Sequence, residues 1–124
     1  SPDLNDGDIK KIVEMGLDLK IDGIITSNTT ISRNNLKSKK KLTDETGGLS
    51  GKPLNNRSTD IIRLIHEYSN KKLPIIGVGG IMTTQDALDK INAGASLIQL
   101  YTGFIYNGPS FARNINKEII KSLN

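Results

Sequence analysis

Hydrophobic residues recur at helical spacing in four stretches of the chain, separated by shorter apolar runs. The predicted helices cover residues 5–19, 58–68, 83–93 and 109–122. Asp3 or Asn5 is placed to cap the first helix, and Thr83 or Thr84 the third. The second helix is predicted to open at Ser58.

Continuous apolar runs at residues 23–27, 73–78 and 95–100 predict strands buried on both faces. Strands that alternate with amphipathic helices indicate right-handed βαβ units and a parallel sheet, so the fold class is α/β. Three strands are too few to close a barrel. The chain is therefore either a small open α/β domain or a piece of something larger, and the piece is favoured because open sheet edges need partners.

Composition narrows the possible functions. The length of 124 residues fits one domain, and the net charge of +4 comes mostly from Lys. The densest basic run, residues 37–41, has no neighbouring aromatic side chain that could stack on a base, so it is interpreted as a solvated loop and not a nucleic-acid site. The chain has no Cys, which excludes disulfides, thiolate chemistry and Cys-type zinc sites within it.

Two further features concern processing and membranes. No stretch approaches the roughly 20 apolar residues that a membrane-spanning helix needs. The chain starts at Ser1 and not at an initiator Met, so we expect a processed or truncated product.

Polar or small residues follow each predicted strand. Residues 27–30 end the first strand, Gly79–Gly80 the second and residues 101–103 the third. In βα architectures ligands collect at the carboxyl ends of strands, where backbone amides and helix N-termini point outward. A Gly pair lets backbone N–H groups approach an anion closely, so these ends predict a phosphate site.

Each feature also has a simpler explanation. Gly79–Gly80 can be a plain turn, residues 28–30 a turn with a helix cap, and Lys52–Pro53 a solvated loop. His66 is interpreted as a surface or half-buried helix residue and not as a base, and Gln99 as a local hydrogen-bonding residue of the sheet. Three strand ends of the same character in one chain favour the ligand site.

The motifs at these strand ends resemble those of the dihydroorotate dehydrogenase family. The run Ile75–Ile81, with Thr83, Ala87 and Gly94–Ala95 after it, resembles a signature of that family. Residues 22–30 are similar to its strand-6 segment, and Leu100–Thr102 to its strand-8 segment. Residues 47–54 resemble the corresponding loop of the quinone-dependent class rather than the soluble class.

The resemblance implies the site. The family binds FMN at the barrel mouth and oxidises dihydroorotate to orotate. By resemblance, the substrate-binding residues are Asn28 and Thr29, and the cofactor-binding residues are Ser27, Ser50, Gly51, Gly79, Gly80, Tyr101 and Thr102. No catalytic residue is expected in this chain, because the family's general base, a Ser in the quinone class, belongs to an upstream loop.

The resemblance also implies the architecture and partners. Residues 1–124 would be the C-terminal part, about strands 6–8 with flanking helices, of one FMN-binding (β/α)8 TIM-barrel domain. Expected partners are dihydroorotate or orotate, a quinone, the missing N-terminal part of the barrel and, through an upstream segment, a bacterial or mitochondrial inner membrane. The alternatives are a non-catalytic FMN- or phosphate-binding half-barrel and a soluble fumarate-using enzyme. The fragment alone is expected to be inactive.

Overall fold

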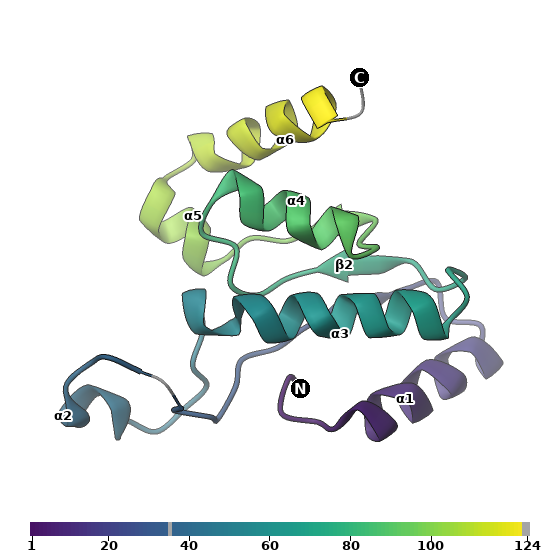
Figure 1. The fold of residues 1–124 in the computed structure, drawn as a ribbon, viewed down its shortest axis with the longest axis horizontal. Coiled ribbons are helices and arrows are strands. Elements are labelled where there is room, and N and C mark those ends of the chain that lie inside the picture. Colours follow the sequence, from purple (N-terminus) through teal and green to yellow (C-terminus); the bar gives the residue numbers. More distant parts are fainter. Residues whose placement is uncertain (35, 123–124) are drawn as a thin grey trace.

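The computed structural model describes residues 1–34 and 36–122, and helices alternate with short strands along them (Figure 1). In chain order the elements are α1 (Asp6–Asp18), β1 (Ile24–Thr26), α2 (Lys40–Thr43), the 3-10 turn η1 (Lys52–Leu54), α3 (Asn55–Tyr68), β2 (Ile75–Gly77), α4 (Thr84–Asn92), β3 (Leu97–Ile98), α5 (Thr102–Asn107) and α6 (Ser110–Ser122). Each strand is shorter than the apolar run that predicted it.

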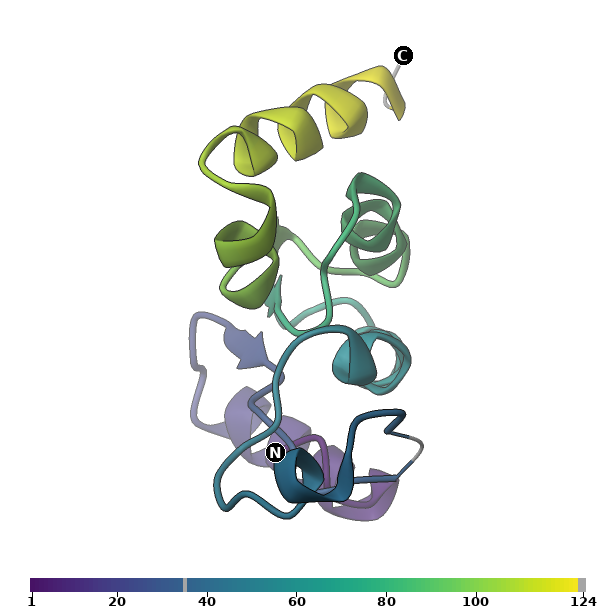
Figure 2. The same cartoon turned by 90° about the vertical axis from the view of Figure 1, so that its left-hand side faces the viewer.

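The strands form one parallel sheet in the order β1-β2-β3, as predicted. Helices α1, α3, α4 and α6 form a row in which each helix contacts the next, and Figures 1 and 2 show this row along the sheet. Strand order follows chain order because each crossover helix returns the chain to the next position in the sheet. The result is a layer of strands beside a layer of helices.

The hydrophobic core forms two clusters. The larger joins α1, α3 and the strands, and its fully buried members include Val13, Ile62 and Ile75. The smaller joins α4 to α6 through Ala87 and Ile115. The apolar faces that the helical spacing predicted are therefore the faces that pack.

The other face of the sheet is open. Ile25 and Leu97, which align with Ile76 in adjacent strands, are 60% and 62% exposed. The prediction that the strands are buried on both faces is therefore wrong for the described part of the chain. Helices cover only one face there, so every second side chain of a strand points away from them.

Three helix starts were predicted either with two candidate caps or at the wrong residue. Asn5 caps α1 by accepting a hydrogen bond from the Asp8 N–H, and Thr83 caps α4 in a reciprocal pair with Asp86. The prediction that the second helix opens at Ser58 is wrong, because η1 leads directly into α3 at Asn55. Pro53 fits such a start, where its missing N–H costs no helical hydrogen bond.

Two short helices were not predicted. The four-residue α2 lies in the basic segment that was interpreted as a loop, and none of its residues is buried. The six-residue α5 is separated from β3 by three residues and buries only Gly103. Neither is long enough for apolar periodicity to show in sequence.

Candidate functional site

A pocket of about 440 Å³ lies at the carboxyl ends of the strands. This volume is within the range of small-molecule sites. Every residue that was predicted to contact substrate or cofactor lines it: Ser27, Asn28, Thr29, Ser50, Gly51, Gly79, Gly80, Tyr101 and Thr102. The structure thus brings together residues that are up to 75 positions apart, from Ser27 to Thr102.

The Gly-rich loop after β1 is fastened to the site. Thr30 and Leu49 exchange two backbone hydrogen bonds, with N···O distances of 3.1 and 2.8 Å. The Arg33 guanidinium donates to the carbonyls of Gly47 and Glu45. A Cβ at Gly48 would collide with the side chain of Thr29, so only Gly lets the loop lie this close. The loop is therefore a wall of the pocket.

The same loop also reaches the end of β3. The Thr102 hydroxyl donates to the Ser50 hydroxyl across 3.1 Å. Gly51, at a φ of +81°, lies against the Thr102 methyl group, which would be 3.0 Å from an added Cβ. A side chain at position 51 would be strained as well as crowded. Ser50 and Gly51 thus connect the first and third strand ends.

Asn28 and Thr29 are exposed at the pocket mouth. The Asn28 Oδ1 accepts a hydrogen bond from the Thr29 N–H at 2.7 Å, and the Thr29 hydroxyl lies 3.4 Å from the same oxygen. No described residue accepts from the Asn28 side-chain NH₂. That group is a fixed donor suited to a carboxylate or a ring carbonyl oxygen.

The turn at Gly79–Gly80 is oriented by α3. The Ser58 hydroxyl donates to the Gly79 carbonyl at 2.8 Å, and the Asn55 side-chain amide to the Gly80 carbonyl at 2.9 Å. Both following peptide bonds are trans, so the N–H groups of Gly80 and Ile81 point away from these contacts. Within residues 1–34 and 36–122, neither N–H donates a backbone hydrogen bond. Two adjacent free donors are suited to an anion.

Ser27 carries an unsatisfied buried hydroxyl. The residue is 9% exposed, and its Oγ has no hydrogen-bond partner among the described residues. An unpaired buried hydroxyl is costly, so such a group in a pocket wall is expected to meet a ligand. Together with the free N–H groups of Gly80 and Ile81, it makes the pocket chemically suited to a polar, phosphorylated ring compound.

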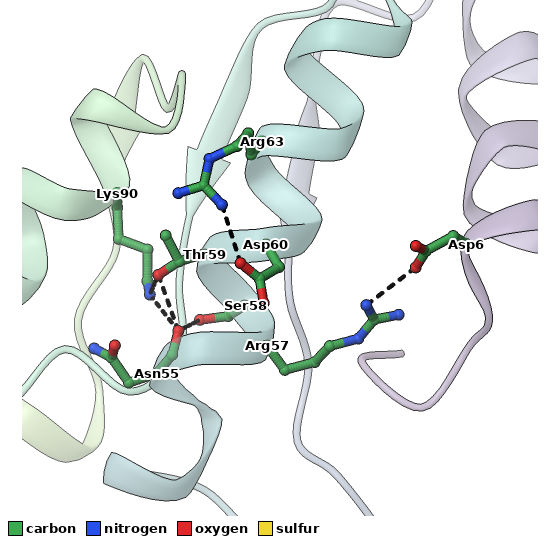
Figure 3. Close-up of polar contacts among 8 residues, drawn as sticks. All are labelled: Asp6, Asn55, Arg57, Ser58, Thr59, Asp60, Arg63 and Lys90. Atoms are coloured by element: carbon green, nitrogen blue, oxygen red, sulfur yellow. Dashed lines mark hydrogen bonds and ion pairs between the residues drawn. The ribbon is translucent and has the colours of Figure 1, made fainter.

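A buried cation lies behind the Gly79–Gly80 turn (Figure 3). Lys90 on α4 is 0% exposed, and its Nζ donates to the Asn55 carbonyl at 2.9 Å and to the Thr59 hydroxyl at 2.5 Å. Burial lowers the pKa of Lys90 to about 8, against the opposing effect of nearby carboxylates such as Asp86. Burial alone would raise the pKa of Asp86, but N–H donors at Met82 and Thr83 outweigh it and lower that pKa.

Comparison with known proteins identifies the family. The sequence model of the family described as "Dihydroorotate dehydrogenase" matches residues 1–123. The chain belongs to the dihydroorotate dehydrogenase family. It is 56% identical over 121 residues to a dihydroorotate dehydrogenase (quinone) of Christiangramia forsetii, covering 98% of this chain and 35% of that protein. The mitochondrial dihydroorotate dehydrogenase (quinone) of Arabidopsis thaliana is 46% identical, with 99% of this chain and 27% of that protein covered.

A solved dihydroorotate dehydrogenase has the same fold. The crystal structure of the Eimeria tenella protein in complex with ferulenol superposes with a TM-score of 0.91 at 42% identity, covering all of this chain and 32% of that one. The chain thus spans about a third of the length of the relatives that it matches. The predicted fold class, a portion of a (β/α)8 barrel, is confirmed.

The roles of individual pocket residues remain predictions. His66 is half-buried in α3, as predicted, and its ring packs against Gly94. Gln99 is exposed and lines the pocket, and its side chain makes no hydrogen bond to any described residue.

In residues 1–34 and 36–122 no helix is long and apolar enough to cross a membrane, and no cluster of acidic or His side chains could hold a metal ion.

The residues behind the pocket were not predicted from the sequence. Asn55 and Ser58 hold the two glycine carbonyls, and Lys90 holds the carbonyl of Asn55. One signal was available: Lys90 is three positions after Ala87 on the apolar side of a predicted helix. A Lys at such a position is rarely buried unless it is hydrogen-bonded.

Proposed function

We propose that the full-length protein oxidises dihydroorotate to orotate with FMN as cofactor and passes the electrons to a quinone, in pyrimidine biosynthesis. One observation carries the proposal: all the residues that the resemblance predicts to contact substrate or FMN line a single pocket at the carboxyl ends of three parallel strands. The relatives named as quinone-dependent dihydroorotate dehydrogenases support the electron acceptor.

The proposed cofactor contacts follow the chemistry of the pocket. The FMN phosphate would bind at Gly79, Gly80, Tyr101 and Thr102, where backbone amides lie at two adjacent strand ends. Ser27, Ser50 and Gly51 would contact the rest of the flavin, which gives the unpaired Ser27 hydroxyl a partner. When bound, FMN supplies the redox chemistry of both half-reactions.

The proposed role of this chain in the reaction is binding and orientation. The Asn28 NH₂ and the Thr29 hydroxyl would hold the planar, anionic pyrimidine at the pocket mouth. A substrate held in one pose reacts faster because little further rotational and translational entropy is lost when it reaches the transition state. The general base is proposed to come from the part of the barrel outside this chain.

The decisive experiment uses the complete reading frame. Protein purified with bound flavin is mixed anaerobically with dihydroorotate, and the flavin absorbance is followed before and after a quinone is added. We expect dihydroorotate to bleach the absorbance and the quinone to restore it. Restoration by fumarate and not by the quinone would identify the soluble class instead.

Two other outcomes would overturn the proposal. Flavin that dihydroorotate does not bleach would leave a non-catalytic flavin-binding barrel. Absence of bound flavin, with no uptake of added FMN, would remove the cofactor assignment itself.

The proposed location is a membrane surface, bacterial inner or mitochondrial inner, reached through a segment upstream of this chain. The mitochondrial relative of Arabidopsis thaliana and the lipid-soluble quinone support this proposal. Fractionation of cells expressing the full-length protein tests it. Recovery of the whole activity in the soluble fraction at physiological salt would contradict it.

A further inference from the structure

We propose that Lys90 is a positioning residue for the phosphate-binding turn at Gly79–Gly80, acting through the first turn of α3. The proposal rests on the proposed function, because it assigns the anion at this turn to the FMN phosphate. It adds a residue that does not line the pocket.

A continuous chain of hydrogen bonds joins Lys90 to the turn (Figure 3). The Lys90 ammonium donates to the Asn55 carbonyl, and the Thr59 hydroxyl donates to the same oxygen at 2.9 Å. The Ser58 hydroxyl lies 3.1 Å from that oxygen and 2.8 Å from the Gly79 carbonyl, so the two carbonyls share its one proton. The Asn55 amide and the Ser58 hydroxyl in turn hold the carbonyls of Gly80 and Gly79. Gly80 is therefore linked to the ammonium through Asn55, and Gly79 through Asn55 and Ser58.

The packing leaves little freedom between α3 and the turn. Gly80 has a φ of +73°, and a Cβ there would collide with the backbone of Asn55. A Cβ on Gly79 would lie 3.2 Å from the Ser58 Cβ. Displacement of the N-terminal end of α3 would therefore move the Gly79–Gly80 segment and redirect the free N–H groups of Gly80 and Ile81.

The ammonium also contributes charge. Lys90 makes no ion pair within 4 Å in the described part of the chain, and its hydrogen-bond acceptors are a carbonyl and a hydroxyl. Its positive charge is therefore not neutralised by direct contact, and it lies at the first turn of α3, where the helix dipole is also positive. Both effects favour an anion at the adjacent turn.

The test compares FMN with riboflavin, which lacks the phosphate. Apoprotein of the full-length wild type and of the Lys90→Met variant is titrated with each flavin, and quenching of flavin fluorescence gives both dissociation constants. We expect Lys90→Met to weaken FMN binding about tenfold or more and riboflavin binding by less than about threefold, since contacts that involve charged groups contribute more than neutral ones. Lys72→Met, at an exposed position, is the matched control and should change neither constant.

Two further variants separate the causes. Lys90→Gln keeps a neutral hydrogen-bond donor. Any recovery of the preference for FMN over riboflavin relative to Lys90→Met would measure the contribution of the hydrogen bonds. The loss that remains relative to the wild type would measure the contribution of the charge. Thr59→Val removes one acceptor of the ammonium without removing the charge. It should lower FMN selectivity to a lesser degree, and together with Lys90→Gln it decides the question if Lys90→Met does not fold.

The contrary outcomes are distinct. Equal weakening of FMN and riboflavin in the Lys90 variants, or unchanged FMN selectivity in variants that fold, would overturn the positioning role. A wild type that binds riboflavin as tightly as FMN would instead refute the phosphate site of the proposed function.

Discussion

Asn28 is the pocket residue whose proposed role is most directly testable. Its Oδ1 is held by Thr29, so its NH₂ is fixed as a donor at the pocket mouth. We predict that Asn28→Ala in the full-length protein lowers kcat/KM for dihydroorotate about 10- to 100-fold, the loss expected for a hydrogen bond to a charged ligand. Bound FMN should remain stoichiometric.

Steady-state kinetics and flavin absorbance of the purified variant provide the measurement. Asn114→Ala, on the exposed side of α6, is the matched control and should retain wild-type kinetics. Unchanged turnover in Asn28→Ala with flavin bound would exclude Asn28 from substrate binding.

Lys90 predicts a specific pH dependence of stability. Its pKa in the folded chain is about 8, below the value of 10.5 for an ordinary lysine. Below pH 8 the lysine is charged in both states, and its burial lowers the free energy of unfolding. Between about pH 8 and 10.5 the unfolded state binds more protons than the folded state. The contribution of Lys90 to the free energy of unfolding therefore rises with pH in this range. The Lys90→Met variant lacks that contribution.

We therefore expect the thermal midpoint of the wild type, relative to that of Lys90→Met, to increase between pH 7.5 and 9.5. Scanning calorimetry of both full-length proteins at the two pH values measures it. A difference that is constant or falls with pH would contradict the lowered pKa.

Helix α4 carries both the family signature residue Ala87 and the buried Lys90, and a reciprocal cap defines its start. Thr83 accepts from the Asp86 N–H at 3.1 Å, and the Asp86 carboxylate accepts from the Thr83 N–H at 2.8 Å. The sequence allowed either Thr83 or its neighbour Thr84 as the cap. The geometry selects Thr83, which alone has the extended backbone that a cap requires.

We predict that Thr83→Ala destabilises the protein by about 1 kcal/mol, whereas Thr84→Ala, within the helix, is nearly neutral. Thermal midpoints of the two variants at pH 7 give the comparison. Equal midpoints for the two variants would place the cap elsewhere.

The contribution of the Asp86 carboxylate to stability depends on pH. Because the pKa of Asp86 is lowered, this contribution is present above the ordinary pKa of an aspartate and is lost as the pH falls through the lowered value.

The open sheet face is consistent with a chain that spans about a third of the length of the relatives that it matches. In a closed (β/α)8 barrel this face is the interior, filled by side chains from all the strands. Ile25 and Leu97, exposed in the described part of the chain, then become core residues. An isolated chain with this face and two open sheet edges is expected to self-associate.

A sheet face that becomes the barrel interior predicts opposite outcomes for two similarly exposed leucines. Leu97 is 62% exposed on the sheet and Leu42 is 61% exposed on α2. In the full-length protein, Leu97→Asp should prevent folding because it buries an unpaired charge, at a cost of several kcal/mol, whereas Leu42→Asp should be tolerated. Soluble yield and thermal midpoint of the two variants decide; equal tolerance would show that the face stays exposed.

The order of elements follows from the sequence because it depends on local patterns. Helical spacing located α1, α3, α4 and α6, and β-branched runs located the strands, since both periodicities come from the geometry of the backbone itself. The strand-end residues of the pocket, such as Asn28, Gly79 and Thr102, were also predicted, because chain direction places the residues after parallel strands at one edge of the sheet. Ser50 and Gly51 lie in a loop and were predicted only from the family resemblance.

The contacts that shape the pocket were decided by tertiary structure alone. The local sequence does not show that Lys90 donates to the Asn55 carbonyl or that Ser58 donates to the Gly79 carbonyl, because the partners are distant in the chain. Nor does it show that the side chain of Ile25 is exposed. Periodicity reports that a side chain is on an apolar face, but the partner that a buried polar group finds, and the face that stays open, are set only when the layers pack.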